Sequence, residues 1–88
     1  ERADEILMLE GYGFTIELFV EPGRPARPTE PEAYGLRHLA LHVDDVRKTV
    51  AQIIAAGYEA EPIRQNPFNG KLLTFVKDPD GLPIELHE

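Results

Sequence analysis

The chain has 88 residues, no cysteine and a formal net charge of −7 from 16 acidic and 9 basic residues. Its length allows one small domain whose core is near the lower limit for independent folding. The lack of cysteine excludes disulfides and thiolate chemistry. The acidic balance argues against nucleic-acid binding, which needs clustered lysine and arginine, and no apolar run approaches the length of about 18 residues that a membrane span requires. We expect a cytoplasmic protein, with which the lack of cysteine is compatible.

Two β-prone runs near the N-terminus, residues 5–10 (EILMLE) and residues 14–20 (FTIELFV), surround the loop GYG. This arrangement predicts a β-hairpin. Successive side chains of a strand point to opposite faces, so the side chain of Glu17 would point to the face opposite that of Ile16 and Leu18. An acidic residue at the centre of such an apolar strand is unusual, which makes Glu17 a candidate functional residue.

Prolines divide the chain into two units. Four prolines and two glycines fall within residues 21–35, and proline lacks the N–H that a sheet ladder needs. We therefore predict an N-terminal hairpin over residues 1–20, a Pro-rich linker over residues 21–34 and a larger unit over residues 35–88. The chain begins at Glu1 rather than Met, on the polar stretch ERADE, and we expect the first unit to be incomplete at its N-terminus.

The larger unit has the predicted order strand, helix, strand, strand, strand. The expected strands are LRHLALHV, YEAEPIR, KLLTFVK and LPIELHE, with the turn DPDG between the last two. One helix between four strands defines an α+β fold, in which the aliphatic face of the sheet packs against the helix.

The single predicted helix follows the first strand of this unit. Asp44 is the expected N-cap, with Asp45 placed favourably at the positive end of the helix dipole. The apolar positions follow helical spacing and are Val46, Val50, Ile53 and Ile54. Gly57 is expected to end the helix in a left-handed conformation.

Three predicted strands share one arrangement, with aliphatic side chains on one face and a metal-ligand type of side chain on the other. The polar residues are Glu17 in TIEL, His38 in RHLAL and Glu85 in PIEL. Two carboxylates and one imidazole on a concave surface suit Zn, Ni, Co, Mn or Fe(II), with no selection among these metals. Any one of the three residues is more simply explained by exposure to solvent. Their repetition makes a shared metal site as plausible as three separate surface residues.

The two other histidines are weaker candidates for metal binding. His38 and His42 have the spacing of a helical zinc pair, but four residues of a strand span about 13 Å. Metal–nitrogen bonds are about 2.1 Å long, so at most one of these two histidines is a ligand. His87, two residues after Glu85, would line the pocket or face water.

Polar side chains also surround the predicted loop NPFNG. They are Arg64, Asn66 and Lys71, and they could recognise an anionic group of a substrate. The ordinary polar composition of surface loops is the simpler explanation for each of them.

The segments GLRHLALHVDDV and FVKDPDGLPIELHE, separated by a helix, resemble the second module of the vicinal oxygen chelate superfamily. This superfamily includes glyoxalase I, extradiol dioxygenases, fosfomycin-resistance transferases and bleomycin-resistance proteins. The resemblance covers residues 14–88 and is strongest to small bacterial glyoxalase I-like proteins. It implies two βαβββ modules that curl around one metal, the second complete and the first represented only by its last two strands.

The resemblance also implies a site. His38 and Glu85 look like the metal ligands of the second module, and Glu17 looks like the last-strand ligand of the first. A fourth ligand, usually His or Gln on the first strand of the first module, has no counterpart in this sequence. A lactoylglutathione lyase-like enzyme is implied, in which the metal holds two neighbouring oxygens of a hemithioacetal-type small molecule. Glu85 would move the proton and could exchange this role with Glu17. A homodimer is expected.

Three alternatives remain open at this stage. An Fe(II) extradiol dioxygenase would use two histidines and one carboxylate, so Glu17 argues against it. A non-catalytic protein that binds an antibiotic or another small molecule would not need the three ligand-type residues. A remnant that no longer turns over is also compatible with an incomplete first module.

Overall fold

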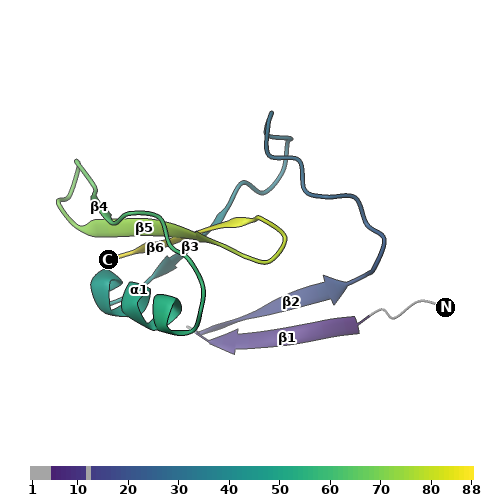
Figure 1. Cartoon of the computed structure of the whole chain (residues 1–88), viewed down its shortest axis with the longest axis horizontal. Coiled ribbons are helices and arrows are strands. Elements are labelled where there is room, and N and C mark those ends of the chain that lie inside the picture. Colours follow the sequence, from purple (N-terminus) through teal and green to yellow (C-terminus); the bar gives the residue numbers. More distant parts are fainter. Residues whose placement is uncertain (1–4, 12) are drawn as a thin grey trace.

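The structure, a computed structural model, describes residues 5–11 and 13–88. The elements of this part of the chain are β1 (Glu5–Gly11), β2 (Phe14–Val20), β3 (Leu39–His42), α1 (Val46–Ala55), β4 (Arg64–Gln65), β5 (Leu72–Lys77) and β6 (Pro83–His87). The predicted α+β class is confirmed, with a βαβββ order from β3 to β6 (Figure 1). Residues 1–4 of the predicted first unit and Tyr12 of its predicted loop lie outside the described residues.

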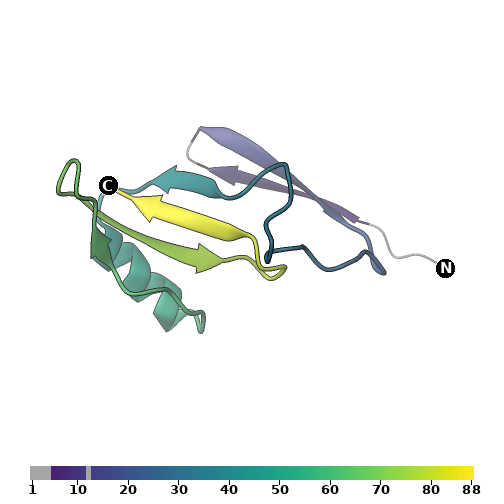
Figure 2. The ribbon, with the colours of Figure 1, turned by 90° about the horizontal axis from the view of Figure 1, so that it is seen from above.

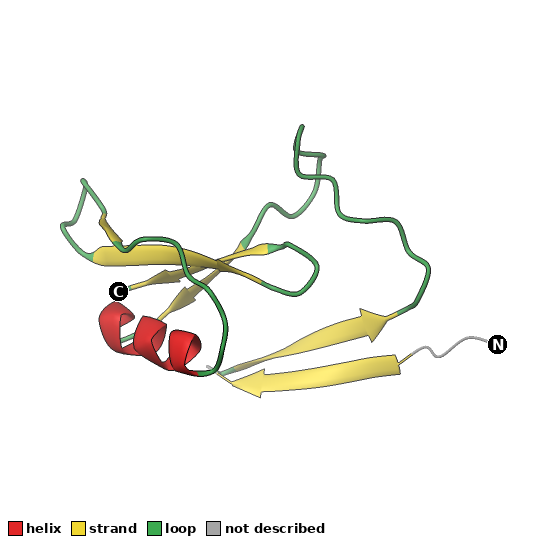
Figure 3. Cartoon of the chain, in the orientation of Figure 1, coloured by secondary structure: helices red, strands yellow, loops and turns green. Residues whose placement is uncertain are grey.

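The main sheet has the strand order β3-β6-β5-β4. β6 pairs in parallel with β3 and antiparallel with β5, so the last strand of the chain lies inside the sheet. The helix α1 covers one face of this sheet, and the long connection from β2 to β3 has almost no regular structure (Figure 3). Among the described residues, no helix combines the length and the apolar character needed to cross a membrane.

The hydrophobic core lies between α1 and this sheet. Its buried side chains are Val43, Val46, Val50 and Leu86, and partly buried aliphatic residues from the neighbouring strands surround them. Thr74 is also fully buried, and its hydroxyl donates to the carbonyl of Glu61 at 2.7 Å. That bond satisfies a polar group which would otherwise be costly to bury.

The boundaries of α1 differ slightly from the prediction. The N-cap is Asp45, whose carboxylate accepts a hydrogen bond from the N–H of Lys48 at 3.0 Å, and the prediction of Asp44 was wrong by one residue. The reason is that Val46, the first helical residue, must point into the core, where it is fully buried. Ile54 is 58% exposed and does not belong to the buried stripe, because it lies about 80° around the helix from Val46.

The C-terminal end of α1 confirms the prediction for Gly57. This glycine has a φ of 94°, and its N–H donates to the carbonyl of Ile54. The N–H of Tyr58 donates to the carbonyl of Ile53, which completes a Schellman motif. A side chain at position 57 would strain this left-handed backbone.

The predicted strand over YEAEPIR was too long. Only Arg64 and Gln65 pair with β5, and the preceding residues run beside it with a single backbone bond from the N–H of Glu61 to Phe75. Pro62 lies in this segment and has no N–H for a ladder, so the pairing cannot continue.

Glu88 joins three elements at the end of β6. Its carboxylate accepts hydrogen bonds from the N–H of Val46 at 3.0 Å and from the N–H of Leu72 at 3.3 Å. The first of these donors lies at the start of α1, where the helix dipole favours a negative charge. The N–H of Val43 meanwhile donates to the carbonyl of His87 at 2.8 Å. The start of the helix is thereby fixed to the end of the central strand.

Replacing Glu88 by Ala should leave two part-buried N–H groups without an acceptor. We expect the free energy of unfolding to fall by about 1–3 kcal/mol, measured by urea titration of the whole chain. Glu59→Ala, which removes an exposed carboxylate, is the matched control and should change stability by less than about 0.5 kcal/mol. Equal effects of the two substitutions would show that Glu88 does not hold these elements together.

The hairpin β1–β2 forms a sheet of its own. Figure 2 shows it beyond the β3 side of the main sheet. It resembles the hairpin β5–β6 in register, because Met8 pairs with Glu17 as Phe75 pairs with Glu85. Glu17 and Glu85 therefore occupy the same register position in the two hairpins, and the assignment of β1–β2 to a first βαβββ module stays a prediction.

Candidate functional site

The sheet face opposite α1 carries the polar side chains predicted for a site. Side chains alternate along β3 and β6, and Leu41 and Leu86 face the helix. Ala40 is paired with Glu85 in the parallel ladder, so His38, two residues before Ala40, shares the face of Glu85. The structure brings these two residues together, with 3.2 Å between His38 Nε2 and Glu85 Oε1.

Both side chains are accessible from the open face. The side chain of His38 is 36% exposed and that of Glu85 is 22% exposed. Phe75, the neighbour of Glu85 across the ladder, contacts the His38 ring edge-to-face with 5.3 Å between ring centroids. The guanidinium of Arg64 lies 5.2 Å from the centroid of the Phe75 ring on the same face. The imidazole is thus held between a carboxylate and an aromatic ring while one side remains open.

Glu17 lies elsewhere in the structure. It is an exposed residue of β2, in the separate hairpin. Within residues 5–11 and 13–88, no three His, Cys, Asp or Glu side chains lie close enough together to hold a metal ion. The structure therefore unites two of the three predicted ligands, and the place of Glu17 as the third stays a prediction.

His42 and His87 form a second imidazole pair. They are paired in the parallel ladder, and their ring centroids are 5.8 Å apart in an edge-to-face arrangement. His87 and Glu85 line a pocket of about 300 Å³, and Asn66 and Lys71 line it as well. The structure thus brings part of the predicted loop cluster to the side of Glu85.

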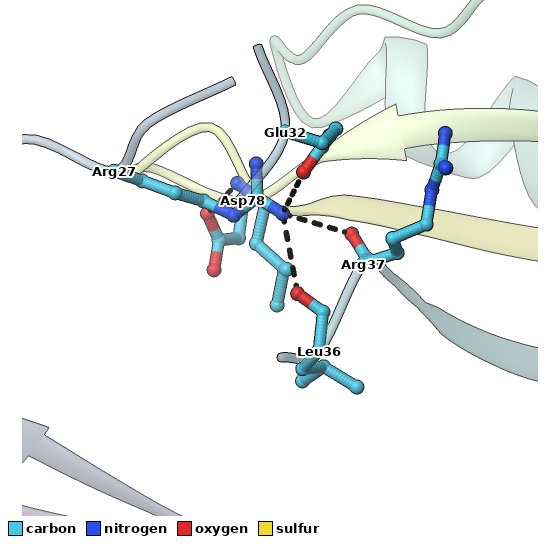
Figure 4. Close-up of polar contacts among 6 residues, drawn as sticks. Arg27, Glu32, Leu36, Arg37 and Asp78 are labelled. Carbon is cyan, nitrogen blue, oxygen red and sulfur yellow. Dashed lines mark hydrogen bonds and ion pairs between the residues drawn. The ribbon is translucent and has the colours of Figure 1, made fainter. Parts of the chain in front are cut away.

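Arg27, which the sequence did not single out, holds the backbone segment that precedes His38. Its Nη2 donates to the backbone carbonyls of Leu36 at 3.3 Å and Arg37 at 3.1 Å, and to the Glu32 carboxylate at 3.2 Å (Figure 4). Asp78, from the turn between β5 and β6, lies beside the same guanidinium in this view. An arginine in a proline-rich segment is part of no helical or strand periodicity. Its hydrogen bonds to Glu32, Leu36 and Arg37 can therefore be identified only from the folded structure.

Replacing Arg27 by Met should free the segment before His38. We expect a loss of about 1–2 kcal/mol in the free energy of unfolding and shifted NMR signals of the His38 ring, because two backbone carbonyls lose a charged donor. Arg24→Met is the matched control, since the Arg24 side chain is 67% exposed and pairs only with Glu21 among the described residues. It should cost less than about 0.5 kcal/mol and leave His38 unchanged. Indistinguishable variants would refute a positioning role for Arg27.

Comparison with known proteins identifies the family of the chain. Residues 1–86 match the model of the Glyoxalase/Bleomycin resistance protein/Dioxygenase superfamily, and the chain belongs to this superfamily. The predicted resemblance to the vicinal oxygen chelate group is thereby confirmed.

Two curated relatives and two solved structures are closely similar. The chain is 51% identical over 82 residues both to the uncharacterized protein YaeR of Escherichia coli K12 and to the uncharacterized protein YwkD of Bacillus subtilis 168. The match covers 93% of this chain but only 63% of the length of each relative. A glyoxalase family protein of Enterococcus faecalis superposes with a TM-score of 0.89 at 47% identity, over 97% of this chain and 68% of that one. The protein SMU.1112c has a TM-score of 0.88 at 40% identity, covering 97% and 70%.

Proposed function

We propose that the chain belongs to a metal-dependent, glyoxalase I-like lyase or isomerase. Its substrate would be a small molecule of the hemithioacetal type, chelated through two vicinal oxygens. The observation that carries this proposal is the 3.2 Å approach of His38 Nε2 to Glu85 Oε1 on the open face of the sheet. Membership of the superfamily and the equivalent position of Glu17 in the other hairpin support it.

The residues fit a divalent transition metal. Two adjacent ligands of one metal, each about 2.1 Å from it, are about 3.0–3.4 Å apart, which matches the separation of the imidazole and the carboxylate. Neither of these donor atoms is committed to a backbone hydrogen bond in the described structure, and both side chains remain partly exposed. We propose His38 and Glu85 as two of the ligands and Glu17 as the third, although the described structure places Glu17 in the separate hairpin. Zn, Ni, Co, Mn and Fe are all compatible with these donors.

The chain's own residues would orient the substrate and move its proton. A bound metal supplies a Lewis acid that favours negative charge on the vicinal oxygens. The Glu85 carboxylate is proposed as the base that takes a proton from one carbon and returns it to the next. Glu17, which has the same register position in the other hairpin, is proposed as able to exchange this role with Glu85. Phe75 limits the rotation of the His38 ring by its edge contact.

Metal content is the direct test. We expect the whole chain to bind one divalent transition metal in equilibrium dialysis with elemental analysis. His38→Ala, Glu85→Gln and Glu17→Gln should each lower the affinity by more than about a hundredfold, because even the outer partners of a metal site contribute 10–100-fold. His42→Ala is the matched control, since this exposed histidine lies on the same face but outside the proposed ligand set.

The outcomes separate the competing functions. Failure of the chain to bind a metal would refute the lyase proposal and favour a small-molecule-binding protein. With the metal bound, turnover of a methylglyoxal–thiol adduct supports the lyase, whereas oxygen-dependent cleavage of a catechol would identify a dioxygenase. Loss of metal in His38→Ala and Glu85→Gln but not in Glu17→Gln would exclude Glu17 from the ligand set.

We also propose that the protein is a homodimer joined in part through the hairpin. Both strands of the hairpin expose large apolar side chains, among them Met8, Phe14 and Phe19, and grouped exposure of this kind marks association surfaces. Sedimentation equilibrium should give twice the chain mass. Phe19→Ser should weaken association by more than about tenfold, since aromatic side chains are frequent anchors of interfaces. Ile54→Ser, at a similarly exposed site on α1, should not weaken it, and a monomeric wild type would refute the proposal.

A further inference from the structure

We infer that the loop between β4 and β5 forms an anion subsite next to the proposed metal site. The Lys71 ammonium and the side-chain amides of Asn66 and Asn69 would hold a carboxylate or phosphate group of the substrate. This inference rests on the proposed function in one respect, namely that the other end of the same substrate lies at Glu85. The anion subsite itself depends only on the residues of the loop.

A single pocket connects the loop with the candidate site. Asn66, Asn69 and Lys71 line one part of this pocket of about 300 Å³, and Glu85, His87 and Glu88 line another. The volume suits one small organic molecule. A ligand that fills the pocket would therefore contact the loop and Glu85 at the same time.

Hydrogen bonds within the loop orient the two amides. Asn66 Oδ1 accepts from the N–H of Phe68 at 2.8 Å, and Asn69 Oδ1 accepts from the N–H of Lys71 at 2.9 Å. Each of these bonds orients its amide, and the NH₂ group of each amide is a donor. The N–H of Asn66 also donates to the carbonyl of Lys71, and that of Gly70 to the carbonyl of Asn66, both at 2.8 Å. The two side-chain amides therefore belong to a loop whose backbone is held by its own hydrogen bonds.

Lys71 supplies the one lysine or arginine charge among the described residues that line this pocket, and the two carboxylates of the lining, Glu85 and Glu88, have contacts of their own. The Glu88 carboxylate accepts from two backbone N–H groups, one of them at the start of α1, and Glu85 lies against His38. In the described part of the chain, no carboxylate forms an ion pair with Lys71. An ammonium with two amide donors matches the oxygen atoms of a carboxylate or phosphate group.

Of the three polar residues that the sequence predicted near this loop, only two, Asn66 and Lys71, line the pocket. Arg64 lies over the Phe75 ring and pairs with Glu61 at 3.7 Å, and it does not line this pocket. The specificity for a charged group is therefore assigned to Lys71, with the asparagines as neutral donors.

A titration of the metal-free chain tests the subsite directly. The NMR signals of the Asn66 and Asn69 side-chain amides are followed while inorganic phosphate or propionate is added at constant ionic strength. We expect saturable shifts for at least one of these anions, and whichever binds more tightly identifies the acidic group. Lys71→Met should weaken binding by at least about tenfold, the effect of removing one charged donor.

Lys77→Met is the matched control, because this exposed lysine lies at the far end of β5 and does not line the pocket. It should change the affinity by less than about twofold. Shifts that fail to saturate with either anion, or that are equal in Lys71→Met and the wild type, would overturn the subsite. Lys71→Gln provides a second variant that also removes the charge.

A second measurement asks whether the subsite serves the substrate of the metal site. Succinic acid monohydroxamate carries two vicinal oxygens and a distant carboxylate, and its carboxamide analogue lacks only that charge. The metal-loaded chain should bind the charged compound about tenfold more tightly, and Lys71→Met should remove only this difference. Equal affinities would overturn the shared-substrate claim. If neither compound binds, the proposed metal chemistry fails, while the metal-free titration still decides the anion subsite.

Discussion

The parallel ladder between β3 and β6 is the interaction on which the rest of the structure depends. It pairs Ala40 with Glu85 and Leu41 with Leu86, joining segments more than 40 positions apart. Because side chains alternate along both strands, the same register sends the leucines into the core and Glu85 to the open face with His38. A slip of one residue would exchange the two faces, exposing the core and separating the imidazole from the carboxylate.

Two further contacts hold this ladder at its ends. Glu88 and the backbone of His87 join the end of β6 to Val43 and to the start of α1. At the other end, Arg27 reaches from the linker to the carbonyls that precede His38. The core of four buried side chains is small, so these polar contacts contribute a substantial part of the order around the site. The candidate metal-binding residues His38 and Glu85 consequently lie on strands whose ends are held in place. The loop between β4 and β5, which lies beside them, determines which further groups a bound small molecule can contact.

The two hairpins contain similar local sequences in different surroundings. TIEL in β2 and PIEL in β6 place Glu17 and Glu85 at the same register position, each opposite a large apolar residue of the preceding strand. Only the second hairpin is joined to a parallel strand and covered by a helix in the described structure. This difference explains why Glu85 has an imidazole neighbour and Glu17 is exposed. It also explains why the apolar side chains of β1 and β2 are available for contacts outside their own sheet.

The sequence by itself determined the elements and the alternation of faces. Turn residues, periodic aliphatic positions and the left-handed glycine at position 57 are local features, so the hairpin, the helix and the order of the second module could be predicted from them. Tertiary structure decided the rest. Burial of Val46 moved the N-cap to Asp45, and Pro62 limited the pairing of β4 to two residues. The meeting of His38 with Glu85, the backbone contacts of Arg27 and Glu88, and the position of Lys71 beside the site all join residues that are distant in sequence. No local pattern encodes such contacts, because they follow from strand register and from which backbone groups folding leaves unpaired.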